Sequence, residues 1–422
     1  MKYNMTFIED LIWRGLVKDC TDLEGLKERL NKPVIAYCGI DPTADSLHIG
    51  HLQQIILLKR YQQAGHTPIA ICGGGTGMIG DPRPTTERKL ISQDELLHNI
   101  NCIKIQLSQF LDFDNNVILL NNYDWLSKIS LIDFLRDYGK YFNISNMIAK
   151  DTIASRLSTG ISFTEFTYTI LQAIDWLYLY ENYNCEVQIG GSDQWGNLVS
   201  GSDLIKKIKG DTAKVYGITS PLITKSDGSK FGKSEGGNIW LDPKKTSPYE
   251  FYQFWLNVAD EDSIEYLKKL TLIDREEIEE LQESLAKEAH LRKPQKRLAQ
   301  YLTELVSNKE GLDSAINITN TLFSGDITSL SLEDLKVGLK DASSSVINDG
   351  DNIIDVLVKA KVCNSNREAR ELISNNSIAI NGTKINDLSF NLYIKDALYN
   401  ELSIVKKGKK NWYICYFERT DI

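Results

Sequence analysis

Apolar residues follow two alternating patterns through the first half of the chain. Short extended runs occur at 34–38, 69–72, 117–120 and 187–189, and stretches with helical spacing lie at 49–64, 87–111 and 163–182. A further helix is predicted within 5–30. Alternation of strands and helices favours an α/β fold, in which helices cover both faces of a parallel sheet and ligands bind at the carboxyl ends of the strands.

The stretch 163–182 is apolar almost throughout and is predicted to be a buried helix. Tyr168, Gln172 and Asp175 interrupt it at spacings of four and three, so they form one polar stripe on its surface. A buried polar group without a partner costs about 1 to 3 kcal/mol. The stripe therefore needs a partner, either another element or a ligand, and the motifs nearby favour a ligand.

The first extended run leads through a turn rich in Gly, Asp and Pro into a helix predicted to begin near His48. His48 and His51 share one face of this helix, and Gly50 between them allows a flat ligand close to the backbone. Unsatisfied backbone donors and the positive end of the helix dipole suit an anion. A buried histidine pair and half of a metal site are the alternatives. Metal is disfavoured, because no third ligand stands at a suitable spacing.

Three further segments carry candidate chemistry. Residues 73–82 read GGGTGMIGDP, whose glycines permit a close approach to a ligand but match neither a dinucleotide fingerprint nor a P-loop. Residues 190–197 read GGSDQWGN and open a helix after the fourth extended run. Residues 225–236 read KSDGSKFGKSEG, a basic segment of the kind that could close over polyphosphate.

The second half of the chain changes character twice. Residues 246–308 read as helices, the first of them capped by Ser247. Residues 324–350 are rich in Ser, Asp and Gly and read as a linker. Beyond it the pattern predicts two helices, a strand and a hairpin turn at Asn381-Gly382.

Composition is that of an ordinary globular protein, with 42% hydrophobic and 25% charged residues. The net charge of −9 argues against wholesale coating by nucleic acid. Residues 351–422 are mildly basic, with 11 Lys and Arg against 9 Asp and Glu, so this part could contact RNA locally. No apolar run approaches membrane-spanning length, and the seven cysteines form no CxxC pair. We therefore expect a cytoplasmic protein without a membrane segment, a disulfide framework or a zinc site.

HIGH at 48–51, GGSDQWGN at 190–197 and KFGKS at 230–234 occur in this order in a chain of alternating strands and helices. The set resembles the class I aminoacyl-tRNA synthetases and, within them, the bacterial-type tyrosyl-tRNA synthetases; the likeness covers nearly the whole chain. It implies a Rossmann-like catalytic domain at 1–225, the KFGKS loop with a helical anticodon-side domain at 226–325, a linker at 326–350 and an S4-like RNA-binding domain at 351–422.

The resemblance also implies roles for individual residues. L-tyrosine would be activated by ATP, with Mg²⁺, to tyrosyl-adenylate and transferred to the 3′ end of its tRNA by a homodimer. The implied catalytic residues are His48, His51, Lys230, Lys233 and Ser234. Tyrosine would be bound by Tyr37, Asp81, Tyr168, Gln172, Asp175 and Gln194. ATP would be bound by Cys38, Gly39, Asp41, Thr43, Gly50, Gly191, Asp193 and Lys233. RNA would be bound by Arg367 and Arg370, and no resident metal site is implied.

One segment departs from the family. DPRPTTERK has Thr85 and Thr86 where many relatives place a lysine, so Arg83 or Arg88 is expected to serve the phosphates instead.

Three other functions are compatible with parts of the pattern. A tryptophanyl enzyme would share the fold, but Tyr37, Asp175 and the tail favour tyrosine. An inactive RNA-binding protein on the same fold would not need all three motifs. A generic nucleotide-binding module would leave the tail unexplained.

Overall fold

The computed structural model of the protein describes residues 5–82, 91–226, 231, 233–234, 237–324, 326–408 and 411–418; of residues 151, 152, 233 and 234 it describes only the backbone. The chain forms two compact units. One comprises Met1–Thr246 and Phe254–Val306, and the other comprises Ser247–Gln253 and Ser307–Ile422.

The first unit is built on a parallel five-stranded sheet with the order β3-β2-β1-β4-β5. Its strands are β1 (Ile35–Ile40), β2 (Thr67–Cys72), β3 (Ile118–Asn121), β4 (Cys185–Gly191) and β5 (Tyr216–Ser220). The four extended runs of the sequence are confirmed as strands, and β5 adds a fifth that was not predicted. Because β1 pairs with both β2 and β4, the strand order reverses beside β1, and ligands bind at such a point in open sheets of this kind.

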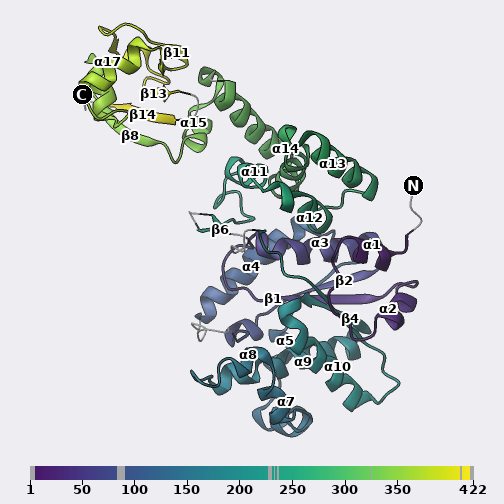
Figure 1. Cartoon of the computed structure of the whole chain (residues 1–422). Helices are drawn as coiled ribbons and strands as arrows, with labels where there is room; N and C mark the ends of the chain where they lie inside the picture. The colour runs from purple at the N-terminus through teal and green to yellow at the C-terminus, as the bar shows by residue number, and fades with distance from the viewer. Residues whose placement is uncertain are drawn as a thin grey trace. The chain divides into compact units, whose positions relative to one another are not determined.

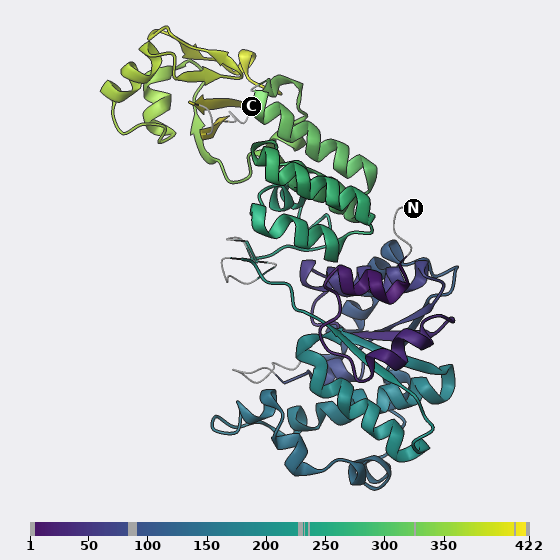
Figure 2. The same cartoon turned by 45° about the vertical axis from the view of Figure 1, so that its right-hand side comes forward.

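Helices cover both faces of this sheet (Figures 1 and 2). On one face lie α1 (Phe7–Trp13), α3 (Ile49–Gln63) and α4 (Gln93–Phe110), and on the other lie α9 (Phe163–Tyr183) and α10 (Trp195–Lys209). The helix α9 begins where the Ser162 side chain accepts the Glu165 amide, and it ends at Asn184, whose positive φ stops the helix. The predicted α/β class is thus confirmed. A short helix, α2 (Leu23–Arg29), precedes β1.

Between β3 and α9 the chain forms short helices that the sequence pattern did not reveal. They are α5 (Tyr123–Leu126), α6 (Leu131–Asp133), α7 (Ile144–Ile148) and α8 (Asp151–Ala154). Each is too short to establish a helical period.

Predicted helices follow the sheet. They are α11 (Pro248–Leu256), α12 (Asp260–Leu270), α13 (Arg275–Glu288) and α14 (Lys293–Ser324). The Ser247 hydroxyl accepts the Glu250 amide at 3.2 Å, which confirms the predicted cap. The helix α14 is broken at Asn308, whose φ of 59° is non-helical. No helix in the described part of the chain is long and apolar enough to cross a membrane.

The second unit carries a mixed sheet with the order β11-β10-β13-β14-β8. Its strands are β8 (Ser343–Ile347), β10 (Ile378–Ile380), β11 (Thr383–Lys384), β13 (Leu402–Lys407) and β14 (Asn411–Phe417); a separate pair is β9 (Asp351–Asn352) with β12 (Asn391–Leu392). The helices are α15 (Leu332–Gly338), α16 (Ile353–Lys359) and α17 (Asn366–Ser374). The hairpin prediction is confirmed: Asn381 and Gly382 both have positive φ, and Ile380 pairs with Thr383.

The segment 326–350 differs from the linker expected there. It contains α15 and β8, and β8 pairs in parallel with β14. Because β8 is an edge strand with mostly exposed side chains, serines are compatible with its place in the sheet. For the same reason its sequence does not show the apolar pattern by which a strand is predicted. The boundaries of the predicted domains remain a prediction.

Candidate active site

The two histidines of the HIGH segment cap the helix that they begin. His48 Nδ1 accepts the Gly50 amide at 3.0 Å, and His51 Nδ1 accepts the His48 amide at 3.2 Å. The ring centroids lie 4.1 Å apart. Since each Nδ1 is an acceptor, the proton of each neutral imidazole is on Nε2. Each ring therefore offers a ligand one N–H donor.

Burial keeps these rings uncharged. It lowers the pKa of His48, and together with the neighbouring His48 it lowers the pKa of His51 to about 3. Both imidazoles are therefore neutral at pH 7. They can donate hydrogen bonds to an anion without adding full positive charge.

The expectation of unsatisfied backbone donors at this helix start is wrong. Ile49 donates its amide to Ile239 O at 3.0 Å, the Gly50 amide is bound by His48, and His51 donates its amide to His48 O at 2.9 Å. A Cβ on Gly50 would lie 2.7 Å from the His48 ring, so this glycine makes room for the capping imidazole. An anion would meet Nε2–H groups here, and Gly50 as a ligand contact stays a prediction.

Two motifs far apart in sequence are joined at this point. Ile49 N bonds to Ile239 O at 3.0 Å and Leu241 N to Leu47 O at 2.8 Å, while Trp240 meets the His48 ring edge-on at 6.1 Å. The chain reaches this pairing from β6 (Lys233–Ser234) and β7 (Gly237–Asn238), which form a hairpin. The residues that follow the KFGKS segment are therefore anchored to the HIGH segment.

Several candidate residues of this region belong to the part of the chain that the structure does not describe. Lys230, Arg83 and Arg88, with Thr85 and Thr86, lie outside the described residues, and so do the side chains of Lys233 and Ser234. Their predicted roles stay predictions.

Asp175 is the buried end of the polar stripe. Its carboxylate accepts hydrogen bonds from Trp125 Nε1 at 2.8 Å and from Asn122 Nδ2 at 2.9 Å. Burial raises its pKa to about 7 although both bonds oppose the shift. Tyr37, on β1, is buried as well, and after burial the Asp175 charge is the next cause that raises the pKa of its phenol. Among the described residues, the Tyr37 hydroxyl has no hydrogen-bond partner.

A continuous set of hydrogen bonds connects Asp175 to Tyr168. Asn122 donates to Thr76 Oγ at 2.9 Å, Thr76 donates to Asp41 Oδ1 at 2.8 Å, and the Tyr168 hydroxyl donates to Asp41 Oδ2 at 3.0 Å. Tyr168 and Asp175 therefore have protein partners in this structure, and their contacts with a ligand stay a prediction. Gln172 is half-buried, and its side chain has no hydrogen bond within the described part of the chain.

Asp81 and Gln194 meet as neighbours. Gln194 Nε2 donates to Asp81 Oδ2 at 2.7 Å, and Asn197 Nδ2 donates to Gln194 Oε1 at 3.1 Å and to Asp81 Oδ1 at 3.4 Å. The glycine-rich segment after β2 and the helix start after β4 thus come together. Two predicted tyrosine-binding residues lie in contact here.

The predicted ATP residues occupy the carboxyl ends of β1 and β4. Cys38 is buried, and burial with the Asp193 charge raises the pKa of its thiol to about 12, so it stays a neutral thiol. Gly39 and Thr43 are exposed. A Cβ on Gly191 would lie 2.6 Å from Asp193 Oδ1, so a side chain there would displace that carboxylate.

The residues of this site that were not predicted include Thr76, Asn122 and Trp125. Asn122 directly follows β3, so the rule that ligands gather at strand carboxyl ends could have drawn attention to it. In the second unit, Arg367 and Arg370 are exposed on α17, as expected.

Comparison with known proteins gives a consistent result. Residues 28–324 match the family described as tRNA synthetases class I (W and Y), and residues 334–415 match the Tyrosine--tRNA ligase SYY-like C-terminal domain. Two proteins named Tyrosine--tRNA ligase, from Staphylococcus haemolyticus and Staphylococcus carnosus, are each 50% identical over 416 residues, which cover 97% of this chain and 99% of the relative.

Solved structures agree with this result. A C-terminally truncated mitochondrial tyrosyl-tRNA synthetase from Aspergillus nidulans matches with a TM-score of 0.67 and 32% identity, over 76% of this chain and 95% of that chain. A tyrosyl-tRNA synthetase from Archaeoglobus fulgidus complexed with L-tyrosine matches with a TM-score of 0.58 and 17% identity, over 73% of this chain and 100% of that chain; at this identity the likeness concerns the fold alone.

Proposed function

The chain belongs to the class I tRNA synthetases of the tryptophan and tyrosine group and acts as a tyrosine–tRNA ligase, and from this premise we propose how its residues carry out the reaction. ATP and L-tyrosine form tyrosyl-adenylate, and tyrosine then passes to tRNA. The tyrosine carboxylate is itself the nucleophile at the α-phosphorus. The protein therefore has to position the reactants and stabilise charge on the departing pyrophosphate.

The observation that carries the tyrosine pocket is the buried Tyr37 hydroxyl, which has no partner among the residues that the structure describes. Tyr37 lies on β1, where the strand order reverses, and close enough to Asp175 for that charge to raise the pKa of its phenol, so a ligand group is the expected partner of this hydroxyl. Asp175 Oδ1 and Oδ2 each accept one described hydrogen bond and keep a second lone pair. We assign the substrate phenol to Tyr37 and Asp175.

The substrate ammonium is assigned to the opposite group of polar side chains. Asp81 supplies negative charge and is held by Gln194. Tyr168 and Gln172 lie on the same stripe of α9 as Asp175, and Tyr168 is fixed by Asp41. This support is geometric, and binding measurements on variants would test each residue.

ATP is assigned to the carboxyl ends of β1 and β4 and to the start of α3. The second half of β1 contains Cys38 and Gly39, and Asp41 and Thr43 follow that strand. The last residue of β4 is Gly191, and Asp193 follows it. His48 and His51 donate from Nε2 to phosphate oxygens. Lys230, Lys233 and Ser234 are assigned to the phosphates by resemblance alone.

Mg²⁺ would arrive with ATP as part of the substrate. In the described part of the chain, no three His, Cys, Asp or Glu side chains are grouped so as to hold a metal ion. Mg²⁺ does not need such a group of side chains, because it is commonly bound chiefly by phosphate oxygens and water. The ion would neutralise phosphate charge.

Two further assignments concern partners. Arg367 and Arg370 are proposed to contact tRNA, because both are exposed on α17. A homodimer is proposed through the surface formed by the segment before α9 and by the first residue of α9, where Leu131 and Phe163 are 71% and 72% exposed. Sedimentation of Phe163→Asp tests this: a shift toward monomer is expected, and an unchanged dimer would refute the interface. We also propose a cytoplasmic location, since all seven cysteines are free thiols.

The experiment that tests the function is tyrosine-dependent ATP–pyrophosphate exchange, followed by aminoacylation of tRNA. Both activities are expected. Pyrophosphate exchange that depends on tryptophan would identify the protein as a tryptophanyl-tRNA synthetase instead. RNA binding without exchange would identify an inactive protein on the same fold.

A further inference from the structure

One face of α12 holds the chain where the basic KFGKS segment begins. Asp262 accepts the Ser226 amide at 3.1 Å and the Ser226 hydroxyl at 3.2 Å. One turn further along the same face, the Tyr266 hydroxyl donates to Thr224 O at 3.0 Å. Asp262 is 7% exposed, so its carboxylate is buried against the segment that it binds.

The same helix also holds a residue inside the motif. The Phe231 ring lies 5.3 Å from the Tyr266 ring and 6.0 Å from the Trp255 ring, measured between centroids. Ser226 and Phe231 stand on either side of residues 227–230 in the sequence. The segment is thus attached to α12 by a charged hydrogen bond before these residues and by aromatic packing after them.

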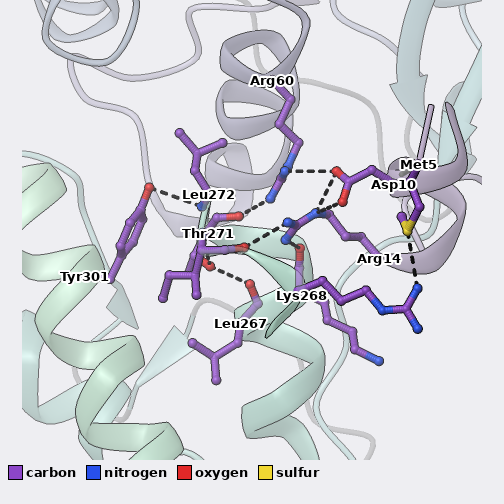
Figure 3. Close-up of polar contacts among 11 residues, drawn as sticks. Met5, Asp10, Arg14, Arg60, Leu267, Lys268, Thr271, Leu272 and Tyr301 are labelled. Carbon is purple, nitrogen blue, oxygen red and sulfur yellow. Dashed lines mark hydrogen bonds and ion pairs between the residues drawn. The ribbon is translucent and has the colours of Figure 1, made fainter. Parts of the chain in front are cut away.

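The other end of α12 is bound to the helix that carries the histidines (Figure 3). Arg14, which directly follows α1, donates to Lys268 O at 3.2 Å and to Ile273 O at 2.8 Å, and Arg60 of α3 donates to Thr271 O. Asp10 lies between the two guanidinium groups and accepts from both. Cations at the carboxyl end of a helix are favoured by its dipole, so this end of α12 is held firmly.

These contacts connect the two catalytic motifs through one rigid element. The helix α3 starts at the HIGH histidines and ends near Arg60, which binds α12, and α12 in turn binds Ser226 and Phe231. An acid in the first turn also favours α12 through the helix dipole, but that role requires no partner. The two hydrogen bonds from Ser226, one from its amide and one from its hydroxyl, favour a more specific role.

We propose that Asp262 is a positioning residue for adenylate formation, which holds Ser226 and so sets where the KFGKS segment leaves α12; this rests on the proposed function. Asp262 touches neither reactant. Its loss should therefore slow the step in which ATP reacts and leave tyrosine binding intact.

The test compares Asp262→Asn with Glu261→Gln. Glu261 is the adjacent, exposed acid in the same turn, so its variant loses the same charge near the helix start but no bond to Ser226. Single-turnover adenylate formation in Asp262→Asn should be about tenfold slower or more, the usual effect of losing a hydrogen bond to a charged group. Tyrosine affinity should stay within about twofold. Glu261→Gln should match the wild type in both.

Hydrogen exchange of the Ser226 amide supplies a readout that does not depend on activity. It should be faster in Asp262→Asn and unchanged in Glu261→Gln. If Asp262→Asn folds poorly, Ser226→Ala, which removes only the hydroxyl bond, should still slow adenylate formation by a smaller factor.

The outcomes separate this inference from the proposed function. A wild-type protein without pyrophosphate exchange would refute the function itself. An active wild type with an unchanged rate in Asp262→Asn, or with rate and tyrosine affinity lost in equal proportion, would refute the positioning role.

Discussion

Replacing Tyr37 by Phe should reduce the preference for tyrosine over phenylalanine without weakening the fold. The Tyr37 hydroxyl is buried and has no partner among the described residues, so its removal breaks no bond within the protein. With tyrosine bound it would make one neutral hydrogen bond, worth about 0.5–1.5 kcal/mol net. The activation efficiency kcat/KM for tyrosine should therefore fall by roughly 2- to 13-fold, while that for phenylalanine stays unchanged.

The assay is pyrophosphate exchange with each amino acid, combined with thermal unfolding. Tyr61→Phe is a matched control, because Tyr61 is also fully buried and its hydroxyl also lacks a partner in the described part of the chain, but it lies on α3 near its carboxyl end. Its kinetics should equal those of the wild type. If Tyr37→Phe keeps the preference for tyrosine, or loses activation efficiency equally with both amino acids, other residues recognise the substrate phenol.

Three further predictions follow from the same geometry. His48→Ala should lower the rate of adenylate formation on the order of 100-fold with nearly unchanged tyrosine affinity; equal loss of affinity would make the residue structural. Burial raises the pKa of Asp175 to about 7, so between about pH 4 and about pH 7 the folded protein keeps a proton that the unfolded chain has lost. The free energy of unfolding of the wild type, compared with that of Asp175→Asn, should therefore fall as pH rises through this range. A difference that does not change with pH would contradict the raised pKa. Asp10→Asn should destabilise the fold by about 3–5 kcal/mol in urea, since it leaves the buried Arg14 and Arg60 without their shared carboxylate, and a loss below 1 kcal/mol would refute that reasoning.

The sequence pattern was sufficient for the central strands because they are buried on both faces. The runs that became β1 and β2 are apolar without interruption, and the run that became β4 is interrupted only by the buried Gln188. The strand β5 was missed because its run, YGITS, contains polar residues that are nevertheless buried, as Thr219 and Ser220 are. A hydrophobic pattern cannot recognise a polar residue whose partner is supplied by another element.

The same limit applies to the site. The positions of His48, Tyr168 and Asp175 on their helices follow from spacing, but their partners come from other segments. Asn122 reaches Asp175 only because β3 lies at the edge of the sheet beside β2, and no local signal encodes this order. The residues of the polar stripe were therefore predictable from the sequence. Which of them bind other protein side chains and which bind a ligand was not.

The histidine caps show how local structure can determine the chemistry of the site. A cation at the start of α3 would bind the phosphates of ATP before the reaction as well as during it. A neutral Nε2–H attracts an oxygen more strongly as negative charge accumulates on it, and this favours the transition state over bound ATP. Because the caps use both Nδ1 atoms, they fix the tautomer, and burial fixes the charge. The start of α3 thus presents two uncharged donors, and the pairing of Trp240 with His48 anchors the residues that follow the KFGKS segment beside them.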